Sequence, residues 1–139
     1  SVMNLAFASN LIREVEKLAQ EMGVKAVVAV SDAAGRPVAI ECMDGAYIGS
    51  FDVALNKTFT SVAFQMSTAE LGKLASPGGS LYGIQNTNDG KIVIFGGGEP
   101  LYVDDVLIGA IGVSGGTAEQ DTALGAYGKN IAKEVISWK

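Results

Sequence analysis

The sequence contains no histidine among its 139 residues, and this absence excludes several kinds of chemistry at once. A serine or cysteine nucleophile activated by histidine is excluded, because no imidazole is present to accept the proton. The usual imidazole ligands of zinc and of haem iron are excluded for the same reason. Any chemistry or binding therefore depends on other side chains or on the backbone.

Cysteine and positive charge are also scarce. The single cysteine, Cys42, permits neither an internal disulfide nor a CxxC zinc motif, which suits a reducing, cytoplasmic location. Without a histidine partner, Cys42 is interpreted as a small buried hydrophobe rather than a nucleophile. The net charge of -5 argues against nucleic-acid binding, for which a basic face is typical. We expect no membrane partner, because no apolar run could span a bilayer and no signal segment opens the chain.

The residues that are abundant predict a packed domain. Hydrophobic residues make up 48% of the chain, which predicts one domain over residues 1–139 with a sizeable core. Apolar positions at helical spacing predict helices at residues 4–22, 50–66, 68–74 and 118–138. Extended apolar runs predict strands at residues 25–31, 37–42, 91–95, 101–103 and 106–113. Short connections favour an antiparallel sheet, so the fold class is α+β, an α/β/α sandwich with helices on the sheet.

One stretch, VLIGAIGVSGGTAEQD at residues 106–121, organises the rest of the chain. It begins as an apolar strand, turns at a Ser-Gly-Gly corner and starts a helix that Thr117 and Gln120 can close with a capping box. The simpler interpretation is a well-made joint between a strand and a helix. The alternative is a pocket floor, in which the amides of Gly115 and Gly116 meet a polar group of a ligand.

The remaining chemical motifs are weak. No P-loop triplet occurs, and Gly109, Gly112 and Gly115 have the wrong spacing for a dinucleotide fingerprint. Lys57 lies among small and apolar residues, where it would meet a carboxylate partner, face an anionic ligand or extend to the surface. Paired carboxylates could do acid–base work, although solvated surface charge is the better account of any one of them. The candidates are Asp44, Asp52, Glu99 and Asp121.

Four pieces of the sequence, taken together, resemble one known family. They are AVSDAAG at 29–35, MDGA at 43–46 followed by Ser50, Ala54 and Lys57-Thr58, GGGEPL at 96–101, and IGAIGVSGG with EQD at 108–121. This pattern resembles the GlcG/HbpS family, which includes the C-terminal domain of PduO-type proteins. The resemblance implies a profilin-like or PAS-like α/β/α fold with a five-stranded antiparallel sheet. It also implies self-association into dimers or larger rings.

The same resemblance bears on the ligand. Some members of the family bind haem through a histidine in or near the first helix, and one branch is described as degrading or sensing haem. Because this chain has no histidine, haem would have to be held by Met43, Cys42 or a tyrosine. Other members belong to operons of glycolate or diol metabolism.

The leading hypothesis is an oligomeric, non-enzymatic protein that binds a small molecule. Lys57 is expected to meet an anionic group of that ligand, and no catalytic or metal-binding residue is assigned. The predicted site is lined by Met43, Asp44, Lys57, Gly97, Gly98, Ser114 and Gly115. One alternative is an enzyme that acts on a small carboxylate or aldehyde, or degrades haem, with Asp44 or Glu99 as its base. Another is a structural partner inside a metabolic assembly.

Overall fold

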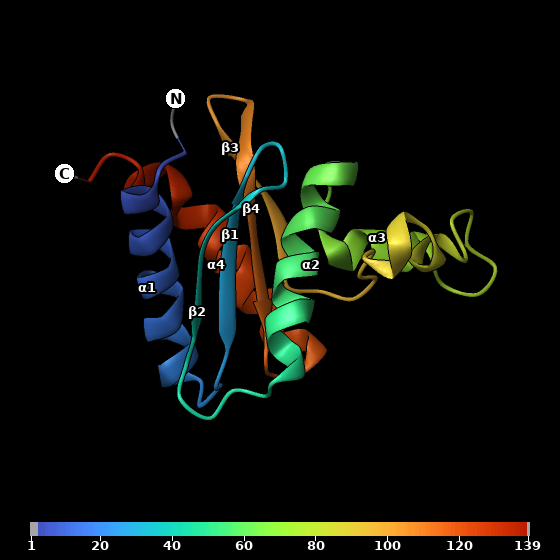
Figure 1. Ribbon diagram of the computed structural model, residues 1–139, viewed down its shortest axis with the longest axis horizontal. Coiled ribbons are helices and arrows are strands. Elements are labelled where there is room, and N and C mark those ends of the chain that lie inside the picture. The colour runs from blue at the N-terminus through green and yellow to red at the C-terminus, as the bar shows by residue number, and fades with distance from the viewer. Residues whose placement is uncertain (1–2, 139) are drawn as a thin grey trace.

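The computed structural model describes residues 3–138 and shows an antiparallel sheet with helices on both faces (Figure 1). The strands follow the order β2-β1-β4-β3, and every neighbouring pair is antiparallel. The expected α+β class is therefore confirmed. The helices are α1 (Leu5–Glu21), α2 (Gly49–Phe64), α3 (Thr68–Leu74) and α4 (Ala118–Val135). The strands are β1 (Val27–Asp32), β2 (Pro37–Cys42), β3 (Gly98–Val103) and β4 (Val106–Ser114), and short 3-10 turns occupy Ile84–Asn86 and Asn88–Gly90.

The sheet has four strands, so the expectation of five is wrong. The segment 91–95, expected to be a strand, lies beside α2 instead of joining the sheet. Ile92 and Val93 are buried there, and the Val93 amide donates to the hydroxyl of Thr60 on α2 at 3.0 Å. An apolar run indicates burial, but it does not identify the neighbour that provides the burial.

The two faces of the sheet are covered differently. Helices α1 and α4 pack on one face and form the main core with side chains such as Val28, Ile111 and Val113. Helix α2 covers the other face, where the apolar cluster is small and centres on Val27 and Ala29. The α2 side of the sheet therefore holds the smaller apolar cluster and most of the buried polar residues of the chain.

Helix α2 lies close to the sheet because the strands present glycines to it. A β-carbon on Gly112 would collide with the carbonyl oxygen of Ala54 in α2. This close approach leaves room only for small or slender side chains, and most of the buried residues of α2 are accordingly Ser, Thr or Ala. The apolar face expected for this helix is only partly buried, since Phe51 keeps 44% of its surface exposed.

Local signals near the end of the chain are mostly confirmed. Asp104 and Asp105 form the β3–β4 turn with φ of 51° and 63°, the positive values that a tight hairpin turn of this kind requires. The capping box of Thr117 and Gln120 is present at the start of α4. The last helix, however, ends at Val135 and leaves Trp138 outside it. Within residues 3–138, no helix has the length and apolar character needed to cross a membrane.

Candidate functional site

The candidate site lies at one end of the sheet, where several chain segments meet. Val27 at the start of β1 pairs with Cys42 on one side and with Ser114 on the other. The residues that follow β2 and β4, beginning with Met43 and Gly115, therefore flank the segment that leads into β1. Helix α4 and strand β3 also begin at this end.

A groove with two lobes opens here, and we call it the sheet-end groove. The first lobe has a volume of about 550 Å³ and the second about 340 Å³, and Gly23, Val24 and Lys25 line both. These volumes fall within the range of pockets that hold small molecules. The first lobe is completed by Glu16, Gln20, Cys42, Met43 and Asp44, and the second by Gly45, Tyr47, Gly115, Gly116 and Gln120.

Lys25 brings a positive charge to both lobes, while sulfur-bearing side chains line the first. A β-carbon on Gly45 would lie 3.0 Å from Cδ of Lys25, so the lysine side chain passes over that glycine. The amide of Ala26 donates to the Sδ atom of Met43 at 3.4 Å, which fixes this thioether against the start of β1. Cys42 is exposed, so its interpretation as a buried hydrophobe is wrong; β2 is an edge strand and leaves it uncovered.

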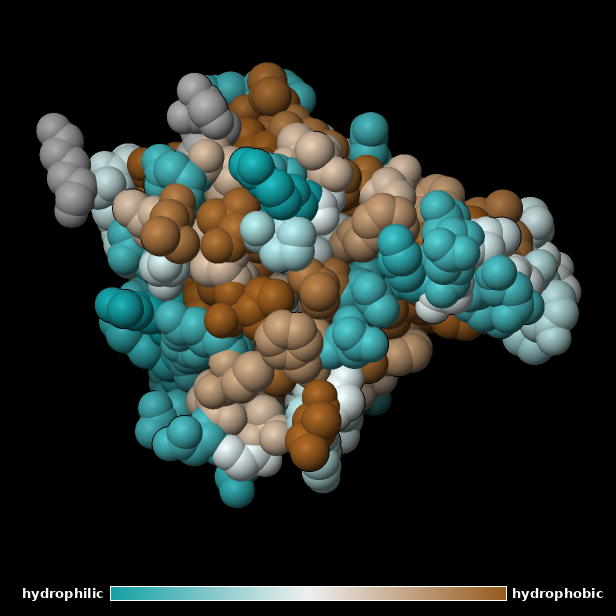
Figure 2. Space-filling model, in the orientation of Figure 1, coloured by the Kyte–Doolittle hydropathy of each residue, from teal (hydrophilic) through white to brown (hydrophobic). Residues whose placement is uncertain are grey.

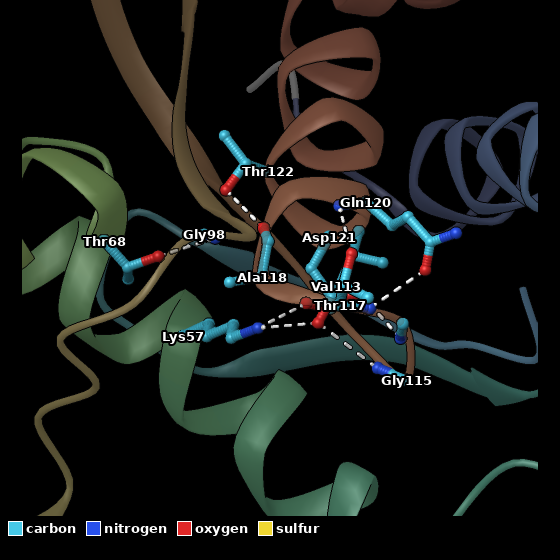
Figure 3. Close-up of polar contacts among 11 residues, drawn as sticks. Lys57, Thr68, Gly98, Val113, Gly115, Thr117, Ala118, Gln120, Asp121 and Thr122 are labelled. Atoms are coloured by element: carbon cyan, nitrogen blue, oxygen red, sulfur yellow. Dashed lines mark hydrogen bonds and ion pairs between the residues drawn. The ribbon is translucent and has the colours of Figure 1, made fainter.

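Lys57 lies behind the groove and is fully buried, and its ammonium group points toward Val113 and Asp121 (Figure 3). Its Nζ atom donates to the carbonyl oxygen of Val113 at 2.7 Å and to Oδ2 of Asp121 at 3.4 Å. The ammonium also lies 5.2 Å from the centre of the Phe95 ring, within the range of a cation–π contact. Burial lowers the pKa of Lys57, and the charge and hydrogen bond of Asp121 partly oppose this effect. We call this pair the Lys57–Asp121 bracket, because it joins α2 to the start of α4.

The glycine corner after β4 is held by the same carboxylate (Figure 3). Asp121 accepts hydrogen bonds from the amides of Gly116 at 2.9 Å and Gly115 at 3.4 Å. The pocket-floor interpretation assigned these amides to a ligand, whereas in the structure they donate to a side chain of the protein. Lys57, Asp121 and the corner thus form one connected support beneath the second lobe.

The structure divides the seven predicted site residues into two layers. Met43, Asp44 and Gly115 line the groove. Lys57 lies behind it, and a β-carbon on Gly97 would come within 2.7 Å of its Nζ atom. The other two are buried as well: Gly98 donates its amide to the Thr68 hydroxyl at 2.9 Å, and Ser114 is 7% exposed.

The bases named for the enzymatic alternative lie apart. Asp44 lines the first lobe, whereas Glu99 lies on β3 with an oxygen 3.7 Å from Nζ of Lys129. Burial raises the pKa of Glu99, and the nearby Lys129 opposes that rise. Among residues 3–138, no cluster of three or more His, Cys, Asp or Glu could hold a metal ion.

Sequence reasoning missed several residues of the groove, above all Lys25 and Glu16. Lys25 lies in the connection between a helix and a strand, and Glu16 lies on the polar side of an amphipathic helix. Both are ordinary patterns. Their place in the groove follows from the strand order, which the sequence pattern alone does not give. In an antiparallel sheet with β1 between β2 and β4, the residues before β1 must lie between the ends of its two neighbours.

Comparisons with known proteins agree on one family. A family model described as haem degrading protein HbpS-like matches residues 3–129. An uncharacterized 15.0 kDa protein in the dhaT-dhaS intergenic region of Citrobacter freundii is 43% identical over 124 residues, which cover 89% of this chain and 87% of that protein. The corrinoid adenosyltransferase PduO of Salmonella typhimurium is 40% identical over 80% of this chain, which spans only 33% of that enzyme. The crystal structure of a PduOC:heme complex matches with a TM-score of 0.83 and 36% identity, covering 93% of this chain and 91% of that one.

Proposed function

The chain belongs to the HbpS-like family, and on that premise we propose that it binds a haem-type tetrapyrrole in the sheet-end groove. The observation that carries the proposal is the similarity to the PduOC:heme complex, which extends over 93% of this chain. The groove supports it independently, because it is an open hollow of suitable size where the MDGA segment and the Ser-Gly-Gly corner of the sequence meet.

The side chains of the first lobe suit this class of ligand. A tetrapyrrole with carboxylate arms needs an apolar wall, a cation for the carboxylates and a donor for the metal. Val24 and Met43 supply apolar surface, and Lys25 supplies the cation. Thiolate and thioether sulfur are both known haem-iron donors, so the lack of histidine leaves donors available. Cys42, which is exposed, is the proposed donor, because the sulfur of Met43 already accepts the Ala26 amide.

Haem, when bound, would supply the redox chemistry of its iron, and the protein would contribute the donor and the surroundings. The homo-oligomer that the family implies stays part of this proposal. Tyr47, Ile48 and Phe51 are exposed by 75%, 96% and 44% where the chain leaves β2 and begins α2. Figure 2 shows largely hydrophobic surface over this region, and such a patch is typical of a contact between subunits.

Titration with haemin, followed by the Soret absorption band, tests the proposal. We expect a saturable shift of the band for the unmodified protein. Lys25→Ala should weaken binding roughly fivefold, because one exposed ion pair contributes up to about 1 kcal/mol. Lys133→Ala, which removes the same charge from the last turn of α4, should bind haemin as the unmodified protein does.

A further variant tests the donor. Cys42→Ser should still bind haemin but move the Soret band, because the sulfur donor is replaced by a hydroxyl. Absence of any saturable shift with the unmodified protein would contradict the proposed function. An unchanged band in Cys42→Ser would remove Cys42 as the donor.

A further inference from the structure

Two glutamates interact beside the first lobe, and one of them, Glu16, lines it. Glu16 comes from α1 and lines the lobe. Glu41 comes from β2, where it pairs with Val28, and Val28 packs in the core on the α1 side of the sheet. Paired residues of neighbouring strands point to the same face, so Glu41 is directed toward α1. The two carboxyl groups lie close enough to interact through a hydrogen bond, which forms only when one of them carries a proton.

The surroundings of this pair favour the shared proton at neutral pH. Burial, followed by the hydrogen bond and the negative charge of Glu41, raises the pKa of Glu16 to about 7, while Arg13 on α1 opposes the rise. Lys25 and Asp44 are the charged groups on the other walls of the lobe. Below about pH 7 the pair carries one negative charge, and above it the pair carries two.

We propose that the shared proton of Glu16 and Glu41 controls the affinity of the sheet-end groove for anionic ligands. With the proton in place, the lobe holds one more negative charge than positive, because Lys25 faces a single charge on the pair and that of Asp44. Loss of the proton adds a second negative charge to the wall, which repels the carboxylates of a ligand. This inference rests on the proposed function and describes how that same site is regulated.

Haemin binding at pH 6 and pH 8 provides the test. The unmodified protein should bind about fivefold more weakly at pH 8, the effect of one extra charge near a ligand carboxylate. Glu41→Gln replaces the shared proton by an amide donor and removes one charge, so this pH dependence should disappear. Glu21→Gln, an exposed acid on the same helix, should keep it. Comparing variants at each pH cancels the pH dependence of haemin itself.

A measurement without ligand separates the claim about the proton of Glu16 and Glu41 from the claim that the groove binds haem. Carbon-13 NMR of the glutamate carboxyl groups should show Glu16 titrating near pH 7 in the unmodified protein and at a lower pH in Glu41→Gln. Titration of Glu16 near its ordinary value of 4.5 would overturn this inference whatever haemin does. Equal pH dependence in the unmodified protein and Glu41→Gln would also overturn it, yet leave haem binding intact. Absence of binding at both pH values would overturn the proposed function and this inference with it.

Discussion

Lys57 places a full positive charge inside the protein, where its desolvation must be offset by its neighbours. The carbonyl of Val113, the carboxylate of Asp121 and the ring of Phe95 together surround the ammonium. Removing one member of a buried ion pair is costly, because the other charge stays buried without its counterion. The bracket therefore stabilises the wall of the groove rather than contacting the ligand.

Lys57→Met should lower the free energy of unfolding by about 3 kcal/mol, because it leaves the Asp121 carboxylate without a cation. Asp121→Asn should have an effect of similar size, since it leaves the ammonium without its counterion. In the double variant both charges are absent, so its loss of unfolding free energy should be smaller than the sum of the two single losses. The difference should be about 1–3 kcal/mol. Urea denaturation of the three variants measures this, and strictly additive losses would contradict the coupling.

The sequence indicated Lys57 as unusual and offered a carboxylate partner as one alternative. It named Asp121 separately, as a possible acid or base, because the two residues are 64 positions apart. Their pairing depends on α2 and α4 reaching the same end of the sheet, and composition and spacing carry no information about that.

At the scale of elements, the spacing between α2 and the sheet is set by glycine. Gly112→Ala should lower the free energy of unfolding by about 1–3 kcal/mol, because its β-carbon would push against the backbone of α2 at Ala54. Gly49→Ala is a matched control in the first turn of α2, where nothing lies within 4 Å of a β-carbon. It should be neutral or stabilise by up to about 1 kcal/mol, as alanine favours helix. Thermal unfolding compares them, and equal midpoints would contradict the packing argument.

Elements governed by local signals were predicted well, and those governed by tertiary contacts were not. The capping box at Thr117 depends on residues within one turn, so the sequence alone reveals it. The segment 91–95 has the composition of a strand but packs on α2, where Thr60 takes the hydrogen bond that a neighbouring strand would have taken. The buried face of α2 was misjudged for a related reason, since close glycine contacts favour small side chains over large apolar ones.

At the scale of the whole molecule, the topology creates the groove. The order β2-β1-β4-β3 brings the ends of β2 and β4 to either side of the segment before β1. A second hollow of about 580 Å³ lies at the opposite end of the sheet, where the start of α1 meets the β1–β2 and β3–β4 turns. The predicted residues at 43–44 and 114–115 lie at the end of the sheet where the groove opens, but only the assembled fold shows which of them line a hollow.

The most direct test of ligand binding at the sheet-end groove is an NMR titration with gallium protoporphyrin IX, a diamagnetic analogue of haem. The largest amide shifts should fall in residues 23–25, 42–47 and 115–116, which line the two lobes. Shifts concentrated in residues 3–5, 32–36 and 106–108, at the opposite end of the sheet, would contradict the assignment of the groove. Saturating analogue that shifts neither set would contradict tetrapyrrole binding by this protein.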